Sequence, residues 1–117
     1  STPTLDIAAA LGRIGNNQAL FAKLIGLFLQ TETEAAQRIR RTLAAGETET
    51  GRRLAHTLKS TAATVGAIRL QAAARTVEQA LRERGEAGED LLAELQAAHL
   101  EAIAGLESLD LANKQPR

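Results

Sequence analysis

The 117-residue chain contains no cysteine, methionine, tryptophan or tyrosine, and only two phenylalanines and two prolines. Without cysteine it can form neither a disulfide framework nor a thiolate metal site, which fits a reducing compartment. It lacks the aromatic side chains on which nucleic acids stack, and its 14 basic residues are balanced by 14 acidic ones. No apolar run is long enough to cross a bilayer, and no signal peptide is visible. We therefore expect neither nucleic-acid binding nor membrane contact by this domain.

Helix-forming residues are what the chain has in abundance. Ala, Leu, Glu, Arg and Gln dominate, β-branched residues are sparse, and the alternation typical of strands is absent. We expect an all-α fold, with one domain over residues 1–117 and a single core. Because the first residue is Ser rather than Met, we expect a fragment of a longer protein or a chain trimmed at its start. Helices are predicted at about 2–13, 17–45, 47–65, 67–84 and 89–111, the last four forming an antiparallel up-down-up-down four-helix bundle that the short first helix caps.

Caps and apolar stripes support these boundaries. Thr2 before Pro3 resembles an N-cap with a first-turn proline, and Gly15-Asn16-Asn17 offers a turn and a cap for the second helix. The predicted core stripes are Leu20, Leu24, Leu27, Phe28, Ala35, Ile39 and Leu43 in the second helix, Leu54, Leu58, Ala62 and Val65 in the third, Leu70, Ala74, Val77 and Leu81 in the fourth, and Leu91, Leu95, Ala98, Ala102, Leu106 and Leu109 in the fifth.

One histidine lies on the polar side of the third helix. At about 100° per residue, His56 falls roughly opposite the stripe that contains Leu54 and Leu58, so the core does not need it. The pattern predicts an exposed imidazole with cations on one flank and small residues that leave room for a partner. Its neighbours at helical spacing are Arg52, Lys59, Ser60 and Ala63.

An exposed imidazole has several uses, and the residues alone leave some of them open. A metal site lacks partners, because the only other histidine, His99, is distant in the sequence. General-base catalysis has a hydroxyl within reach in Ser60, but nothing indicates an oxyanion site. A neutral imidazole is also a nucleophile, and neighbouring cations would stabilise an anionic group placed on it. A simple solvated surface residue fits the same pattern.

The segment His56-Thr57-Leu58-Lys59-Ser60, with Gly66 ten positions after the histidine, is similar to the signature of histidine-containing phosphotransfer (HPt) domains of two-component phosphorelays. Upstream, Leu5-Asp6, the stretch from Gly15 to Phe21 and the stretch from Leu24 to Leu29 resemble that family's first helices. Downstream, Ala67 to Leu81 resembles the helix that follows the site. One departure is Ser60, where the family most often has glycine; its hydroxyl could bond phosphoryl oxygens or the carbonyl at i−4.

The resemblance implies roles for individual residues. His56 would be the phosphoacceptor through Nε2, Lys59 would lie beside the phosphoryl group, and Gly66 would allow close helix packing. The partner-docking residues would be Arg52, Ser60, Ala63, Gly66 and Ala67.

It also implies partners. These would be receiver domains of a hybrid kinase or a response regulator, with Mg²⁺ held by the receiver and no cofactor or metal bound by this domain. No phosphate-binding loop is visible, so we expect a carrier without its own ATP-dependent kinase activity. We expect a monomer located in the cytoplasm, or in the cytoplasmic part of a membrane-bound sensor kinase.

Two other functions remain open. The chain could be the phosphoacceptor domain of a chemotaxis-type histidine kinase, or a helical adaptor that is never phosphorylated. We expect His99 to be packed at the core boundary and Lys59 to contribute little to the fold. The arginines at 38, 40, 41, 52 and 53 are either solvated helix faces or one basic patch for an acidic partner.

Overall fold

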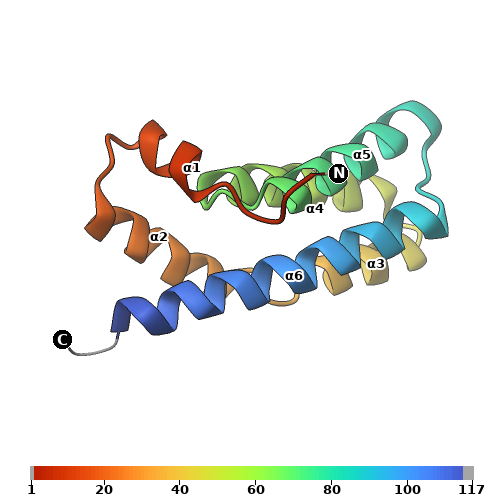
Figure 1. Cartoon of the computed structure of the whole chain (residues 1–117). Coiled ribbons are helices and arrows are strands. Elements are labelled where there is room, and N and C mark those ends of the chain that lie inside the picture. Colours follow the sequence, from red (N-terminus) through yellow and green to blue (C-terminus); the bar gives the residue numbers. More distant parts are fainter. Residues whose placement is uncertain (1, 115–117) are drawn as a thin grey trace.

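The computed structural model describes residues 2–114, and the regular structure within them is entirely helical (Figure 1). The all-α class is therefore confirmed for these residues, whereas the up-down-up-down order of the bundle stays a prediction. The helices are α1 (Ile7–Arg13), α2 (Gln18–Thr31), α3 (Ala35–Ala44), α4 (Thr48–Thr64), α5 (Ile68–Arg84) and α6 (Glu89–Lys114).

Helix α4 is held from two sides. It packs most extensively against α5 and also against α3, while α6 packs against α5, α3 and α2 (Figure 1). Each fully buried aliphatic side chain contributes about 1.5–3 kcal/mol through removal from water. This packing leaves a face of α4 in solvent. The side chains at the centre include Ile39 from α3, Leu58 from α4, Leu70 and Val77 from α5, and Leu95 and Leu106 from α6.

The single helix predicted for residues 17–45 is wrong, because the chain leaves the helical path between α2 and α3. Glu32 ends α2, and its carbonyl oxygen lies 2.7 Å from Nε2 of the buried His99 on α6. Thr61 of α4 donates a hydrogen bond to Glu32 Oε1 at 3.2 Å. The break is thus fixed from α4 and α6. The buried face of α2 also differs from the predicted one: Phe28 is buried as predicted and Phe21 is buried too, while Leu20 and Leu27, predicted in the core, are 40% and 55% exposed.

The helix predicted from residue 2 is also wrong, since α1 begins only at Ile7. Asp6 is its N-cap, and Oδ1 of Asp6 accepts a hydrogen bond from the Ala9 N–H at 3.2 Å. The segment before α1 is tied down elsewhere: the Asp6 N–H donates to the Gly66 carbonyl at 2.7 Å, and Thr4 donates to Glu101 at 2.8 Å. The chain therefore crosses the turn between α4 and α5 before it turns into α1.

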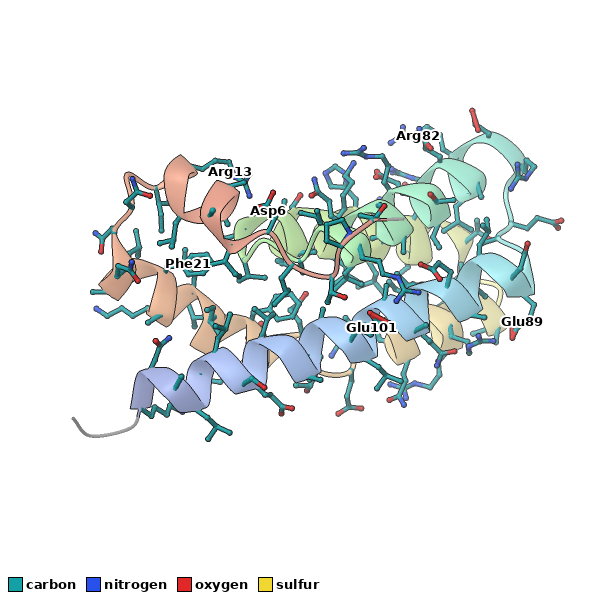
Figure 2. The ribbon with its side chains drawn as sticks, viewed as in Figure 1. Asp6, Arg13, Phe21, Arg82, Glu89 and Glu101 are labelled. Carbon is teal, nitrogen blue, oxygen red and sulfur yellow. The ribbon has the colours of Figure 1, made fainter. Side chains whose placement is uncertain are left out.

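Gly66 makes this crossing possible. Its φ is +76°, and a Cβ atom there would lie 2.7 Å from the carbonyl oxygen of Asp6. Further along α1, Arg13 donates a hydrogen bond to the Ala63 carbonyl at 2.6 Å, and Figure 2 shows its side chain extending from α1 toward α4. Helix α1 is thereby fastened to the C-terminal end of α4.

The cap predicted for the second helix is present, because Asn17 Oδ1 accepts from the Leu20 N–H at 2.9 Å at the start of α2. Helix α5 ends at Gly85, whose φ is +73°. Among residues 2–114, every helix is too short or too polar to span a lipid bilayer.

Candidate functional site

His56 projects from the face of α4 that the core does not use. Its side chain is 56% exposed, whereas Ala55, Leu58 and Ala62 of the same helix are at most 1% exposed. The predicted exposure of His56 is therefore confirmed. Exposure alone would not distinguish it from an ordinary surface residue, so its contacts decide what it can do.

A buried carboxylate holds the imidazole. Nδ1 of His56 lies 2.8 Å from Oε2 of Glu78 on α5, and the Glu78 side chain is only 2% exposed. Two cations share this carboxylate, with Lys59 Nζ 2.7 Å from Oε1 and Arg82 Nη2 3.0 Å from Oε2. Figure 2 shows Arg82 on the side of α5 that faces away from α6. The three donors come from α4 and α5, the two helices in closest contact.

The charge of Glu78 fixes the tautomer of His56. Burial raises the pKa of Glu78, but hydrogen bonds from Lys59 and His56 outweigh it and leave that pKa below its ordinary value. The carboxylate is thus ionised at neutral pH and can only accept hydrogen bonds. Nδ1 of the neutral imidazole must therefore carry the proton, and Nε2 keeps its lone pair on the half-exposed ring. This is the protonation state that a nucleophilic imidazole needs.

A hollow of about 340 Å³ opens beside the ring. It is lined by Arg52, Arg53, His56, Thr57, Glu78 and Arg82. Glu49 lies one turn before Arg53 and neutralises part of this charge: its carboxylate is 2.5 Å from Arg52 and 3.6 Å from Arg53, and its hydrogen bond raises the pKa of Arg52. An anion bound at Nε2 would still lie among guanidinium groups.

The predicted docking residues do not all reach the surface. Ser60 is exposed, and Arg52 and Ala63 are half-buried. Gly66 and Ala67 are buried, with Ala67 at 0% exposure, so their assignment as partner-contacting residues is wrong. The reason is that the turn between α4 and α5 packs beneath the segment that leads into α1.

Two other expectations also need correction. Lys59 was expected to contribute little to the fold, but it is 25% exposed and pairs with the buried Glu78, which joins α4 to α5. Of the two alternatives for the five arginines, the single basic patch does not hold, since Arg40 turns toward α6, where it contacts Glu89 at 2.7 Å and Gln96. Only Arg52 and Arg53 of the five arginines line the hollow beside His56.

Glu78 and Arg82 are the site residues that the sequence analysis missed. Glu78 lies 22 positions after His56, so no local motif connects them. A signal existed, because Glu78 falls four positions after Ala74 and one after Val77, at the edge of the predicted apolar stripe. A carboxylate at a core position is buried only with partners, and this indicates a site.

No group of three or more His, Asp or Glu side chains within residues 2–114 is arranged to hold a metal ion. His99 is 5% exposed, as expected for a packed residue, and its ring contacts the Glu32 carbonyl.

Fold and site together define a helical bundle that presents one imidazole with its proton-bearing nitrogen fixed and its other nitrogen toward solvent. The family model described as "Hpt domain" matches residues 23–107, which include every residue of this site. The chain therefore belongs to the Hpt family, whose members carry out histidine phosphotransfer in phosphorelays and interact with receiver domains. The resemblance found in the sequence is thus confirmed. No curated protein and no solved structure matches the chain.

Proposed function

We propose that His56 accepts a phosphoryl group from the aspartyl phosphate of one receiver domain and passes it to the aspartate of a second receiver. The observation that carries this proposal is the pairing of His56 Nδ1 with the buried, ionised Glu78, which leaves Nε2 as the exposed nucleophile. Family membership supplies the class of reaction, and this contact supports the choice of residue.

In the accepting step, the Nε2 lone pair attacks phosphorus in line with the leaving oxygen. The N–P bond forms as the P–O bond of the acyl phosphate breaks, and the electron pair leaves on the donor aspartate. Lys59 and Arg82 place positive charge near the incoming anion, although both are shared with Glu78. We expect the receiver to hold the Mg²⁺ that the reaction needs and this domain to bind no cofactor.

We propose that the receiver covers the face of α4 between α5 and α2. In-line transfer requires the partner's aspartate within bonding distance of His56, so the surface around Ser60 must admit another protein closely. On the α2 side lies a hollow of about 190 Å³ whose lining includes Leu24, Leu27 and Phe28 of α2 and Thr61 and Val65 of α4. The exposed Leu27 offers apolar contact there, whereas the α5 side offers charge.

The test is label transfer from a panel of phosphorylated receiver domains to the wild-type chain, to His56→Gln and to His99→Gln. We expect acid-labile, base-stable label on the wild type and on His99→Gln, and none on His56→Gln. Label on His56→Gln, or label from ATP alone, would overturn the proposal.

Two further outcomes would identify the alternatives. Labelling only by ATP together with a separate kinase domain would indicate the chemotaxis-type acceptor. A folded wild-type chain that takes no phosphate from any receiver or from phosphoramidate would indicate an adaptor.

A further inference from the structure

We propose that the outer face of α6, formed by its exposed residues between Asp90 and Lys114, binds the same face of a second copy of this chain, with the two helices antiparallel. This differs from the monomer expected from the sequence. It goes beyond the proposed phosphotransfer and does not depend on it.

Helix α6 is apolar on its outer face as well as on its inner one. At 26 residues it is the longest helix of the described chain, and its core side, which includes Leu95 and Leu106, is fully buried. On the opposite side Leu100 is 71% exposed and Leu111 is 64% exposed. A helix that is apolar all round normally packs on more than one side, so the outer face of α6 lacks a partner in the single chain.

The exposed residues of this face repeat with the spacing of a coiled coil. From Asp90 to Lys114, successive positions lie alternately three and four residues apart, and each of them is exposed. At this spacing two helices pack side by side with their side chains interlocked. The positions are Asp90, Ala93, Ala97, Leu100, Ala104, Glu107, Leu111 and Lys114.

Side-chain size fits an antiparallel pairing of two such faces. When Leu100 of one copy lies opposite Ala104 of the other, Leu111 lies opposite Ala93, so each leucine of the face meets an alanine. The short alanine side chains leave room for the leucines and let the two helix axes approach to about 8–10 Å.

The remaining apolar position of this register also has room. Glu107 of one copy lies opposite Ala97 of the other. The methylene groups of Glu107 can cover apolar surface beside this small residue while the carboxylate reaches water.

Charge selects the antiparallel orientation. In the same register, Asp90 of one copy lies opposite Lys114 of the other at both ends of the contact. Lys114 is bonded to Asp110 at 3.0 Å, but its side chain is 72% exposed and its ammonium group has further protons to donate. In a parallel pair Asp90, Glu107 and Lys114 would each face their own copy, and like charges placed opposite one another oppose binding.

The acidic flank of the face does not prevent this pairing. Glu94 and Glu101 lie along one side of the outer face, and Arg69 of α5 pairs with both of them. Their charge is therefore partly neutralised within each copy before the two flanks meet.

The other flank adds a second charge match. Asp110 of the second copy comes beside Gln96, and Gln96 already accepts a hydrogen bond from Arg40 at 2.7 Å. The contact therefore brings a carboxylate of one copy toward a guanidinium group of the other.

The contact leaves both phosphoacceptor sites free. The hollow beside His56 is lined by residues of α4 and α5, and Figure 2 shows Arg82 on the side of α5 that faces away from α6. A dimer thus presents two His56 side chains away from the contact, and transfer from a receiver does not require the pairing.

The first test measures the mass of the full chain by sedimentation equilibrium, at chain concentrations from about 10 μM to about 1 mM. We expect the mass of the wild type to rise from that of one chain toward that of two. Leu111→Glu should weaken association at least tenfold, because it places a charge in the contact. The matched control is Leu20→Glu, a leucine that is 40% exposed on α2 and should associate like the wild type.

A wild-type chain that keeps the mass of one copy up to about 1 mM would overturn the inference and leave the outer face of α6 for a different protein or domain. Equal weakening by Leu20→Glu would overturn it too, because the contact would then not be specific to α6. Circular dichroism checks that each variant is folded.

The second test determines the orientation with engineered disulfides, since the chain contains no cysteine. Ala93→Cys and Leu111→Cys are prepared as separate proteins and oxidised alone and as a mixture. We expect a disulfide between the two variants in the mixture and none within either variant alone, because equivalent residues of an antiparallel pair would lie about 27 Å apart at these positions. A disulfide within either variant alone would indicate a parallel pair, and no disulfide in the mixture would show that the contact lies elsewhere.

The third test exchanges the charges at the ends of the contact. Asp90→Lys should weaken association about tenfold, because it places two cations together at both ends. Adding Lys114→Glu to that variant should restore the wild-type association. A double variant that associates no better than Asp90→Lys would contradict the proposed register.

Discussion

The two histidines of this chain hold their protons on opposite ring nitrogens. His56 is 56% exposed and donates through Nδ1 to a side-chain carboxylate on α5, which frees Nε2. His99 is 5% exposed and contacts the Glu32 carbonyl through Nε2. A carbonyl oxygen can only accept, so Nε2 of His99 must carry the proton. The same type of side chain therefore keeps Nε2 free for the proposed phosphotransfer at one place and bonds a backbone carbonyl at the other.

This difference arises from what each ring faces. The partner of His56 is an anion buried between two helices, and the ring itself lines a hollow that arginines also line. The partner of His99 is the carbonyl at which α2 ends, and the ring lies inside the bundle. We therefore expect substitutions of His56 to act mainly on phosphoryl transfer and substitutions of His99 to act mainly on the free energy of unfolding.

The largest expected effect is from His56→Gln, which removes the nucleophile. Transfer from a phosphorylated receiver should be lost completely, while the free energy of unfolding should fall by only about 0.5–1.5 kcal/mol, because Glu78 loses one of its three donors and keeps Lys59 and Arg82. Label transfer and urea unfolding measure the two quantities. Residual label at wild-type rate would show that another residue is the acceptor.

A bulky side chain next to the exposed His56 should block binding of the receiver and leave the reactivity of the imidazole intact. We expect Ser60→Trp to slow transfer from a receiver by about 100-fold, because a misplaced donor loses in-line geometry. Labelling by phosphoramidate should continue at the wild-type rate.

The matched control is Leu100→Trp. Leu100 is next to His99 and 71% exposed, so a tryptophan there tests bulk at a distance from His56. Equal receiver transfer in Ser60→Trp and the wild type would show that the partner binds elsewhere.

His99→Leu tests the clamp. The Glu32 carbonyl would lose a buried hydrogen bond, and the free energy of unfolding should fall by about 1–3 kcal/mol. The folded protein should still accept phosphate on His56. A variant as stable as the wild type would show that the break between α2 and α3 does not depend on His99.

The smallest effect is expected from Lys59→Ala, which removes one donor from Glu78. The free energy of unfolding at neutral pH should fall by about 1 kcal/mol, in contrast to the neutral effect that the helical pattern alone suggests. Transfer to His56 should also slow, because a cation near the phosphoryl group is lost.

The lowered pKa of Glu78 also predicts how the stability of the wild type and of Lys59→Ala depends on pH. The pKa of Glu78 is lowered in the folded state, so its contribution to stability is present at neutral pH and is lost as the pH falls through the lowered value. In Lys59→Ala that acid-side loss should be smaller. Urea unfolding at neutral and acidic pH tests this, and parallel curves for the two proteins would contradict it.

Local patterns predicted much of this molecule. Periodicity placed α4, α5 and α6 within a few residues, and the Gly15-Asn16-Asn17 segment was identified as a cap because capping is a short-range effect. The surface position of His56 followed from the same periodicity. The break between α2 and α3 did not follow, because a ring 67 positions away fixes it.

Contacts between helices explain the other misses. Lys59 was expected to contribute little to the fold because it points away from the apolar stripe of its own helix, but its partner Glu78 lies on α5. Ala67 was expected at the surface because helical spacing says nothing of the segment that folds over it. Sequence periodicity predicts on which face of its helix a side chain lies, but the contacts of that face depend on the neighbouring helix or segment.

The ten-residue interval from His56 to Gly66 joins two positions that are constrained for unrelated reasons, one chemical and one steric. At about 1.5 Å per residue, the helical part of this interval, from His56 to the end of α4 at Thr64, spans roughly 12 Å, and Gly66 follows in the turn. One end carries the reactive ring; the other is where the segment before α1 crosses the chain so closely that a Cβ atom would meet the Asp6 oxygen at 2.7 Å. In a mutational scan both ends would read as intolerant, yet losses at Gly66 should be recovered by lowering the temperature or adding stabilising substitutions, while losses at His56 should not.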